Sequence, residues 1–371
     1  NNPTTQESAK GYIPETTWND SCTNALFGNV GFSTNAETNC NNPQLSGAVF
    51  AGGGSGGKSS CTAPTGSTAD TCAGGYSKPP WQTGAGVPND NKRDRPDVSL
   101  FAADGFIGNA YAICEADRTG PCSSSNFLQI GGTSASSPAF AGLLALVDQK
   151  TASRQGNPNF ILYKLAAQQP ASNCNSSTGP ASTCAFNDVT SGTIAMPCAT
   201  GTLNCTTSQS GNQYGILSGY NAASGYDLAT GLGSVNASNM VNAWSSVKFT
   251  ASSANLTLNG GNAVNVTHGA PVSVSVSVSP TSPQPTGDVS LLATQGANTL
   301  GLDTLTLSNG TASGTTNMLP GGASYNVKAH YSGDATYGGS DSNTVTVTVT
   351  PEPSKTDLRI VAFNPSTGQV T

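Results

Sequence analysis

The sequence predicts a mixed α/β region followed by an all-β region. We place the α/β region at residues 1–248, a β-sandwich at 249–351, and a linker or the start of a further repeat at 352–371. The division rests on a change in the pattern of residue types near residue 249. Val272–Val278 alternates valine with serine, and Val345–Val349 alternates valine with threonine. Alternation of β-branched and polar residues is typical of strands with one buried face.

The first region contains a helical pattern that follows a pair of glycines. Its apolar residues recur at i, i+3, i+4 and i+7 as Phe140, Leu143, Leu144 and Val147. This spacing forms one apolar stripe on a helix. We expect Pro138 in the first turn, where a missing N–H costs nothing. Two further helices are expected around 160–167 and 238–247.

The composition excludes several classes of function. Only 9% of the residues are charged, the net charge is −6 and the pI is about 4.8. An acidic chain without a basic patch does not favour nucleic acid or an anionic membrane surface as a partner. No apolar run reaches the roughly 20 residues of a membrane span. Few carboxylates also mean few native ion pairs to lose in acid, which is compatible with work at low pH.

All ten cysteines lie before residue 206 and occur as close neighbours. We predict five sequential disulfides, which are Cys22–Cys40, Cys61–Cys72, Cys114–Cys122, Cys174–Cys184 and Cys198–Cys205. A metal site is the competing interpretation, but no CxxC pair occurs and both histidines are far downstream. Disulfides place the protein in an oxidising, extracellular or periplasmic compartment. The start at Asn1, without Met or a signal peptide, indicates a processed product or a fragment.

The run GGTSASSP at Gly131–Pro138 is the strongest catalytic candidate. Glycines before a serine let a substrate backbone approach closely. A helix that begins just after the serine directs N–H groups and partial positive charge at developing negative charge. A serine at this place can also be a simple helix N-cap. The complete run, with its apolar helix, favours Ser134 as a nucleophile.

These residues resemble the serine peptidases of the subtilisin fold, and in particular the sedolisin (serine-carboxyl peptidase) family. Ala135 stands where subtilisins usually carry Met, the run RPDVS at 95–99 precedes the serine at the sedolisin spacing, and Gly156–Pro158 matches the next sedolisin helix. The resemblance covers residues 10–247. It implies a parallel α/β sheet with flanking helices, incomplete at its N-terminus, and a secreted acid endopeptidase acting on peptide or protein substrates.

The resemblance also implies one structural calcium ion, in two glycine-rich segments at 186–192 and 225–233. Calcium binds six to eight oxygens from carboxylates, carbonyls and water. Each segment alone is more typical of an Asx turn than of a set of metal ligands. Position by position, the family resemblance implies carboxylate ligands from Asp188 and Asp227. The implied carbonyl ligands come from Val189, Ala223 and Gly225.

A serine hydroxyl needs a neighbouring base, and the family takes it from a Glu/Asp pair. In the family that pair, and an Asp that stabilises the oxyanion, lie upstream of the region matched here. We therefore assign those roles to no acid in this chain, although Asp97 and Asp104 are nearby in sequence, and we expect Asp97 to be structural. His268 and His330 lie in the predicted sandwich, so they cannot complete a His-based triad. Carboxylates can act as bases in acid, where histidine is protonated.

Residues 250–350 resemble bacterial immunoglobulin-like repeats, through the GDATY run at 333–337 and the closing Val–Thr strand. We expect a spacer or cell-surface stalk, with binding to a cell surface or polysaccharide as the alternative. Two other interpretations of the whole chain stay open. One is an inactive secreted adhesin on the same scaffold, and the other is a subtilisin-type peptidase whose Asp/His segment is missing.

Overall fold

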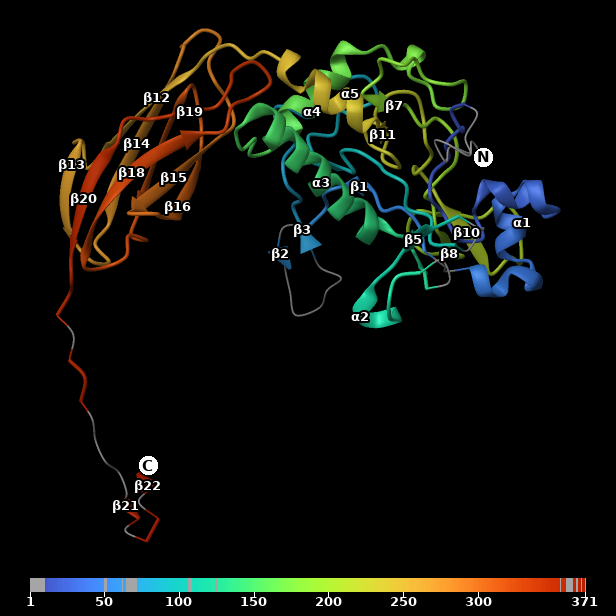
Figure 1. Ribbon diagram of the computed structural model, residues 1–371, viewed down its shortest axis with the longest axis horizontal. Helices are drawn as coiled ribbons and strands as arrows, with labels where there is room; N and C mark the ends of the chain where they lie inside the picture. The colour runs from blue at the N-terminus through green and yellow to red at the C-terminus, as the bar shows by residue number, and fades with distance from the viewer. Residues whose placement is uncertain are drawn as a thin grey trace. The chain divides into compact units, whose positions relative to one another are not determined.

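The computed structural model forms two compact units, residues 1–248 and 249–371 (Figure 1). The residues that it describes are 11–49, 52–61, 63–64, 72–105, 109–123, 126–353, 355–357, 363–364, 366–367 and 369–370. Together the two units make a mixed α/β protein whose C-terminal part is rich in strands.

The first unit combines short strands, short helices and long loops. Its helical elements are η1 (Ala25–Val30), α1 (Ala36–Cys40), η2 (Pro43–Ala48), α2 (Ala116–Thr119), α3 (Thr133–Thr151), α4 (Asn159–Gln168), η3 (Ala171–Asn173), α5 (Ala237–Ala243) and η4 (Trp244–Ser246). Its strands are β1 (Gly57–Lys58), β2 (Ala63–Pro64), β3 (Cys72–Ala73), β4 (Asp94–Arg95), β5 (Tyr111–Ile113), β6 (Leu128–Ile130), β7 (Phe186–Asn187), β8 (Pro197–Ala199), β9 (Cys205–Thr206), β10 (Tyr214–Leu217) and β11 (Ser234–Val235).

The expected parallel sheet is not formed by the described part of this unit. Its strand pairs β1–β4, β2–β3, β5–β6, β7–β11, β8–β10 and β9–β10 are all antiparallel. Parallel pairing is limited to single bridges, such as Ser99 with Ser234. Each strand has two to four residues, too few for a ladder that covers the long helix α3.

The predicted helices are present, with one correction. Helix α3 starts at Thr133, so Pro138 is the sixth residue rather than a member of the first turn. Its missing N–H therefore removes the helical partner of the Ser134 carbonyl. Helix α4 covers the predicted 160–167, and α5 with η4 covers 237–246. Helix α3 packs against α5 (Figure 1). Trp244, which lies beyond α5, donates from Nε1 to Gln155 Oε1 at 2.7 Å.

Four of the five predicted disulfides are formed. They are Cys22–Cys40, Cys114–Cys122, Cys174–Cys184 and Cys198–Cys205. The fifth, Cys61–Cys72, involves a side chain outside the described residues. Each closes a short loop of 7 to 18 residues of sequence separation, in a region with little regular structure. These cross-links stabilise it mainly by restricting the unfolded chain, and they are compatible with an extracellular protein.

The second unit is a sandwich of two sheets. Its strands are β12 (Ser253–Leu258), β13 (Ala263–Thr267), β14 (Val272–Ser279), β15 (Asp288–Gln295), β16 (Asn298–Thr306), β17 (Thr311–Thr316), β18 (Ala323–Tyr331), β19 (Ser340–Asp341) and β20 (Val345–Thr350), with a hairpin of β21 (Phe363–Asn364) and β22 (Gln369–Val370) in the tail. One sheet has the order β12-β14-β17, and the other has β13-β20-β18-β15-β16 with β19 beside β18. All pairs are antiparallel except β13 with β20.

The alternating sequence of this unit is confirmed as alternating burial. Every valine of β14 is buried and every serine is exposed. The valines of β20 face the same core, with Leu291 of β15 and Tyr331 of β18. In neither unit do the described residues include a helix long and apolar enough to cross a membrane.

One buried carboxylate organises a loop of the first unit. Glu37 in α1 accepts hydrogen bonds from the Ser208 and Gln209 backbone amides, the Ser208 hydroxyl and the Asn212 side chain. These bonds, led by the Ser208 hydroxyl, lower the pKa of Glu37 to about 2. Because the folded pKa lies below the usual value of 4.5, the stability from this contact is fully present above that value and is lost as the pH falls from there through about 2.

We expect Glu37→Gln to lower the thermal midpoint at moderately acidic and neutral pH, because its NH2 group must replace one carboxylate oxygen and face either the two Ser208 donors or the Gln209 and Asn212 donors. The difference from the wild type should shrink as the pH approaches about 2, where the native carboxylate gains a proton. Thermal unfolding across this range is the measurement. Asp117→Asn, at an exposed residue of α2, is the control and should leave the midpoint unchanged.

Candidate functional site

Ser134 lies exposed in the first turn of α3, as a nucleophile requires. The helix begins at Thr133 after Gly132, which has a φ of 78°. The amides of Ala135 and Ser136 already donate to the Gly132 carbonyl. The first N–H groups of any helix lack partners within it. Here those groups belong to Thr133 and Ser134, so a negatively charged oxygen beside Ser134 would meet N–H donors and the positive end of the helix dipole.

The two glycines before Ser134, Gly131 and Gly132, lie against a neighbouring segment, residues 101–104. The Gly132 amide donates to the Ala102 carbonyl at 2.6 Å, and the Ser136 hydroxyl donates to the Phe101 carbonyl at 3.1 Å. A Cβ on Gly131 would lie 2.3 Å from the Ala103 carbonyl oxygen and 2.5 Å from the Asp104 Cα. Only glycine allows this close approach at position 131, and the positive φ of Gly132 favours glycine at position 132.

A second segment, 18–20, reaches the same place. The six-membered ring of Trp18 would touch a Cβ on Gly132 at 3.6 Å and one on Gly52 at 3.2 Å. Trp18 Nε1 donates to Asp20 Oδ2 at 2.5 Å. The backbone holds the segment in place, because the Asp20 amide donates to Gly52 and the Gly54 amide donates to Trp18. Trp18 and Asp20 thus form one wall of the site.

Asp20 is 4% exposed and forms a side-chain hydrogen bond with Asp104, which is exposed. Burial raises the pKa of Asp20 to about 6, the Trp18 bond opposes this, and the bond and charge of Asp104 add to it. No sequence pattern predicts the pairing of Asp20 with Asp104. No local signal identifies a contact across 84 positions.

The predicted ligand residues Asp188 and Asp227 come together where the segment after β7 meets the turn at 223–231. We call these two segments the Asp188–Asp227 loop. Asp188 Oδ2 accepts from the Gly225 amide at 3.0 Å, and Asp227 Oδ2 accepts from the Ala223 amide at 2.9 Å. Asp227 Oδ1 accepts from Ala229 and Thr230. The two side chains are 4% and 6% exposed. Burial raises the pKa of both, and the charge of Asp227 raises that of Asp188 further.

One carboxylate oxygen in this loop lacks a partner. Asp188 Oδ1 is buried and accepts no hydrogen bond. A buried, unpaired carboxylate oxygen beside a second carboxylate is costly unless a cation neutralises it. In the part of the chain that the structure describes, no cluster of three or more acidic, histidine or cysteine side chains suits a metal. A calcium ion here would need backbone carbonyls besides Asp188 and Asp227, and the chemistry of the loop fits such an ion.

Asp97 and the two histidines lie in structural contacts. Asp97 accepts from the Tyr163 hydroxyl at 2.9 Å and from Asn159 at 3.2 Å, and it pairs with Arg93. This anchors α4 to the segment before Ser99. His268 pairs with Glu352 and His330 with Asp341, both within the second unit.

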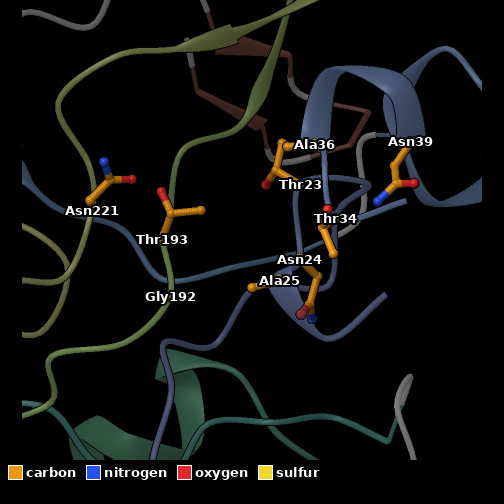
Figure 2. A pocket seen from close by; sticks show the side chains of 9 residues that line it. All are labelled: Thr23, Asn24, Ala25, Thr34, Ala36, Asn39, Gly192, Thr193 and Asn221. Atoms are coloured by element: carbon orange, nitrogen blue, oxygen red, sulfur yellow. The ribbon is translucent and has the colours of Figure 1, made fainter. Parts of the chain in front are cut away.

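A cavity of about 270 Å³ in the first unit is not lined by Ser134 (Figure 2). Figure 2 shows its lining, which consists of Thr23, Asn24, Ala25, Thr34, Ala36, Asn39, Gly192, Thr193 and Asn221. Most of its polar side chains are already engaged. Asn24 bonds Asn19 and Leu26, and Asn39 bonds Ser33. The cavity therefore offers a ligand few free donors, and the candidate site stays at Ser134.

We expect Gly131→Ala to destabilise the first unit and displace Ser134, because its Cβ would overlap the Ala103–Asp104 backbone. Overlaps of this kind cost about 1–3 kcal/mol or more. The matched control is Gly142→Ala in α3, where a Cβ meets nothing within 4 Å. It should stabilise the helix by roughly 0.5–1 kcal/mol. Denaturant unfolding of both variants is the measurement, and equal effects would contradict the assignment of a tight approach.

Comparison with known proteins identifies the second unit. Residues 258–350 match the family described as bacterial Ig-like domain (group 3). No curated protein matches the chain. The matched segment begins with the last residue of β12 and ends with the last residue of β20, so it spans most of the sandwich. The C-terminal β-rich unit of this protein therefore carries an immunoglobulin-like domain.

Proposed function

We propose that this chain carries the nucleophile of a secreted acid serine endopeptidase of the sedolisin type, with a subtilisin-like fold. Ser134 attacks the peptide carbonyl. A Glu in a segment upstream of residue 1 acts as the base that removes the Ser134 proton. An Asp in the same segment orients this Glu. The observation that carries the proposal is the exposed Ser134 at the start of a 19-residue helix, behind two glycines that admit close backbone approach.

The electrostatics at Ser134 support acyl transfer. Attack on a peptide carbonyl creates an oxyanion, which is stabilised by N–H donors fixed before the reaction. The first turn of α3 supplies such donors from its backbone. Since Pro138 has no N–H, the Ser134 carbonyl has no helical partner, which leaves this turn with less regular bonding than the rest of α3.

The exposed apolar residues of α3 support the proposal that a further segment of the protein covers this helix. Leu146 is 50% exposed, Phe140 and Leu143 are only half-buried, and Val147 is 0% exposed. A helix that is apolar on several faces is normally buried on several faces. A segment that covers α3 would be in place to bring the catalytic carboxylates to Ser134. The immunoglobulin-like unit then serves as a spacer or stalk outside the reaction.

We expect the chain together with its upstream segment to hydrolyse peptides in mild acid. Ser134→Ala should lower kcat/KM by about 10³-fold or more, because the nucleophile acts as a unit with its base. The matched control is Ser137→Ala, one turn along the same helix and also exposed. Residues 1–371 alone should be inactive. Activity of this short form, or activity that survives Ser134→Ala, would contradict the proposal.

We also propose that the Asp188–Asp227 loop holds one structural calcium ion, with carbonyls of Val189, Ala223 and Gly225 as further ligands. The unpartnered Asp188 Oδ1 and the two buried carboxylates support it. The ion would neutralise the loop and clamp 186–192 to 223–231. Its role is stability, and the chemistry at Ser134 does not use it.

Calcium should raise the thermal midpoint of the protein. An ion that binds only the folded state adds about 2.7 kcal/mol at a concentration 100 times its Kd. Asp188→Asn removes a ligand charge and should abolish the calcium-dependent rise, whereas the exposed Asp117→Asn should keep it. Calorimetry with calcium, with magnesium and with chelator measures the effect. An equal rise in wild type and Asp188→Asn would show that the ion binds elsewhere.

A further inference from the structure

The contact between Asp20 and Asp104 joins the two segments that enclose the approach to Ser134. Asp20 belongs to segment 18–20, whose Trp18 ring lies against Gly132. Asp104 ends segment 101–104, which accepts the Gly132 amide through Ala102 and lies against Gly131. The two carboxyl groups are therefore the side-chain link between the walls on either side of the glycine pair.

We propose that Asp20 and Asp104 share one proton in a hydrogen bond that we call the latch. In acid the latch holds segments 18–20 and 101–104 in place beside Gly131 and Gly132, and towards neutral pH it releases them. Its effect on catalysis rests on the proposed peptidase function. Its effect on folding does not. Asp20 and Asp104 are positioning residues here, since neither is placed against the reacting atoms.

A hydrogen bond between two carboxyl groups requires a proton on one of them, because an ionised carboxylate can only accept. Trp18 Nε1 donates to Asp20 Oδ2, and the same carboxyl group forms the hydrogen bond with Asp104. When Asp20 is protonated, it donates to the Asp104 carboxylate. When both groups are ionised, two carboxylates face each other and neither can donate. Asp104 is the charged group that acts on Asp20, and the other contacts of Asp20 within the described residues are with the neutral Trp18 ring and the Gly52 backbone.

The direction of the pH effect follows from the raised pKa of Asp20. The folded protein holds this proton more tightly than the unfolded chain, in which Asp has its ordinary value of 3.8. The stability from the latch is therefore complete below pH 3.8 and is lost as the pH rises through about 6. This is opposite to Glu37, whose contact persists into neutral solution.

The test uses two near-isosteric variants that remove the shared proton in different ways. In Asp20→Asn, the amide donates to Asp104 at every pH and its carbonyl still accepts from Trp18. In Asp104→Asn, the amide donates to the ionised Asp20. Asp104 is exposed, so this variant should fold even where a change at buried Asp20 does not. The exposed Asp117→Asn is the control.

Denaturant midpoints of residues 1–371, measured from about pH 4 to about pH 7.5, give the first readout. We expect the midpoint of the wild type and of Asp117→Asn to fall across this range. Asp20→Asn and Asp104→Asn should flatten the fall. The same slope in all four proteins would overturn the latch, and the readout does not depend on activity.

The pH profile of kcat/KM, measured on the protein with its upstream segment, gives the second readout. We expect Asp20→Asn to move the alkaline limb upward by roughly one pH unit or more, which a merely structural residue would not do. An unmoved limb in an enzyme that loses activity with Ser134→Ala would overturn the role in positioning and leave the peptidase function standing. If there is no activity to assay, the proposed function fails. A flattened midpoint slope in Asp104→Asn would then still support the shared proton, because burial of Asp20 alone does not depend on Asp104.

Discussion

The hydrogen bond from the Gly132 amide to the Ala102 carbonyl is the constraint on which the geometry at Ser134 depends. At 2.6 Å it draws two backbones so close that a side chain at Gly131 would overlap the neighbouring segment. The start of α3 is fixed by this contact, and so is the direction in which its first amides point. Ser134 is therefore positioned both by the absence of side chains at Gly131 and Gly132 and by helix α3, which begins directly after these glycines.

Local patterns in the sequence predicted the elements whose signals are local. The alternation at Val272–Val278 and the stripe from Phe140 to Val147 became β14 and part of α3, because periodicity reports which face is buried. The disulfides were predictable because their partners are close in sequence. The antiparallel pairs of the first unit were not predicted. Their strands have two to four residues, too short for period-two alternation to appear.

The candidate site was predictable only in part, for the same reason. Ser134 and its glycines form one contiguous run, and Asp188 and Asp227 each lie in a recognisable turn. The pairing of Asp20 with Asp104 depends on the backbone path of two distant segments, about which single residues say nothing. The position of Pro138 in α3 also differs from the prediction, because the residue pattern alone does not determine at which residue a helix begins. For Ser134 that difference matters, since it leaves the carbonyl of this residue without a helical partner.

The outer face of the immunoglobulin-like sheet has a consequence for where such a domain can work. Strands β14 and β20 present serine and threonine hydroxyls to water where many proteins present carboxylates and amines. Hydroxyl groups bind water equally well whether the medium is acidic or neutral, because they do not titrate in that range. A surface of this kind keeps its hydration when acid discharges carboxylates. The sandwich can therefore stay dispersed in media in which proteins that rely on surface charge would associate.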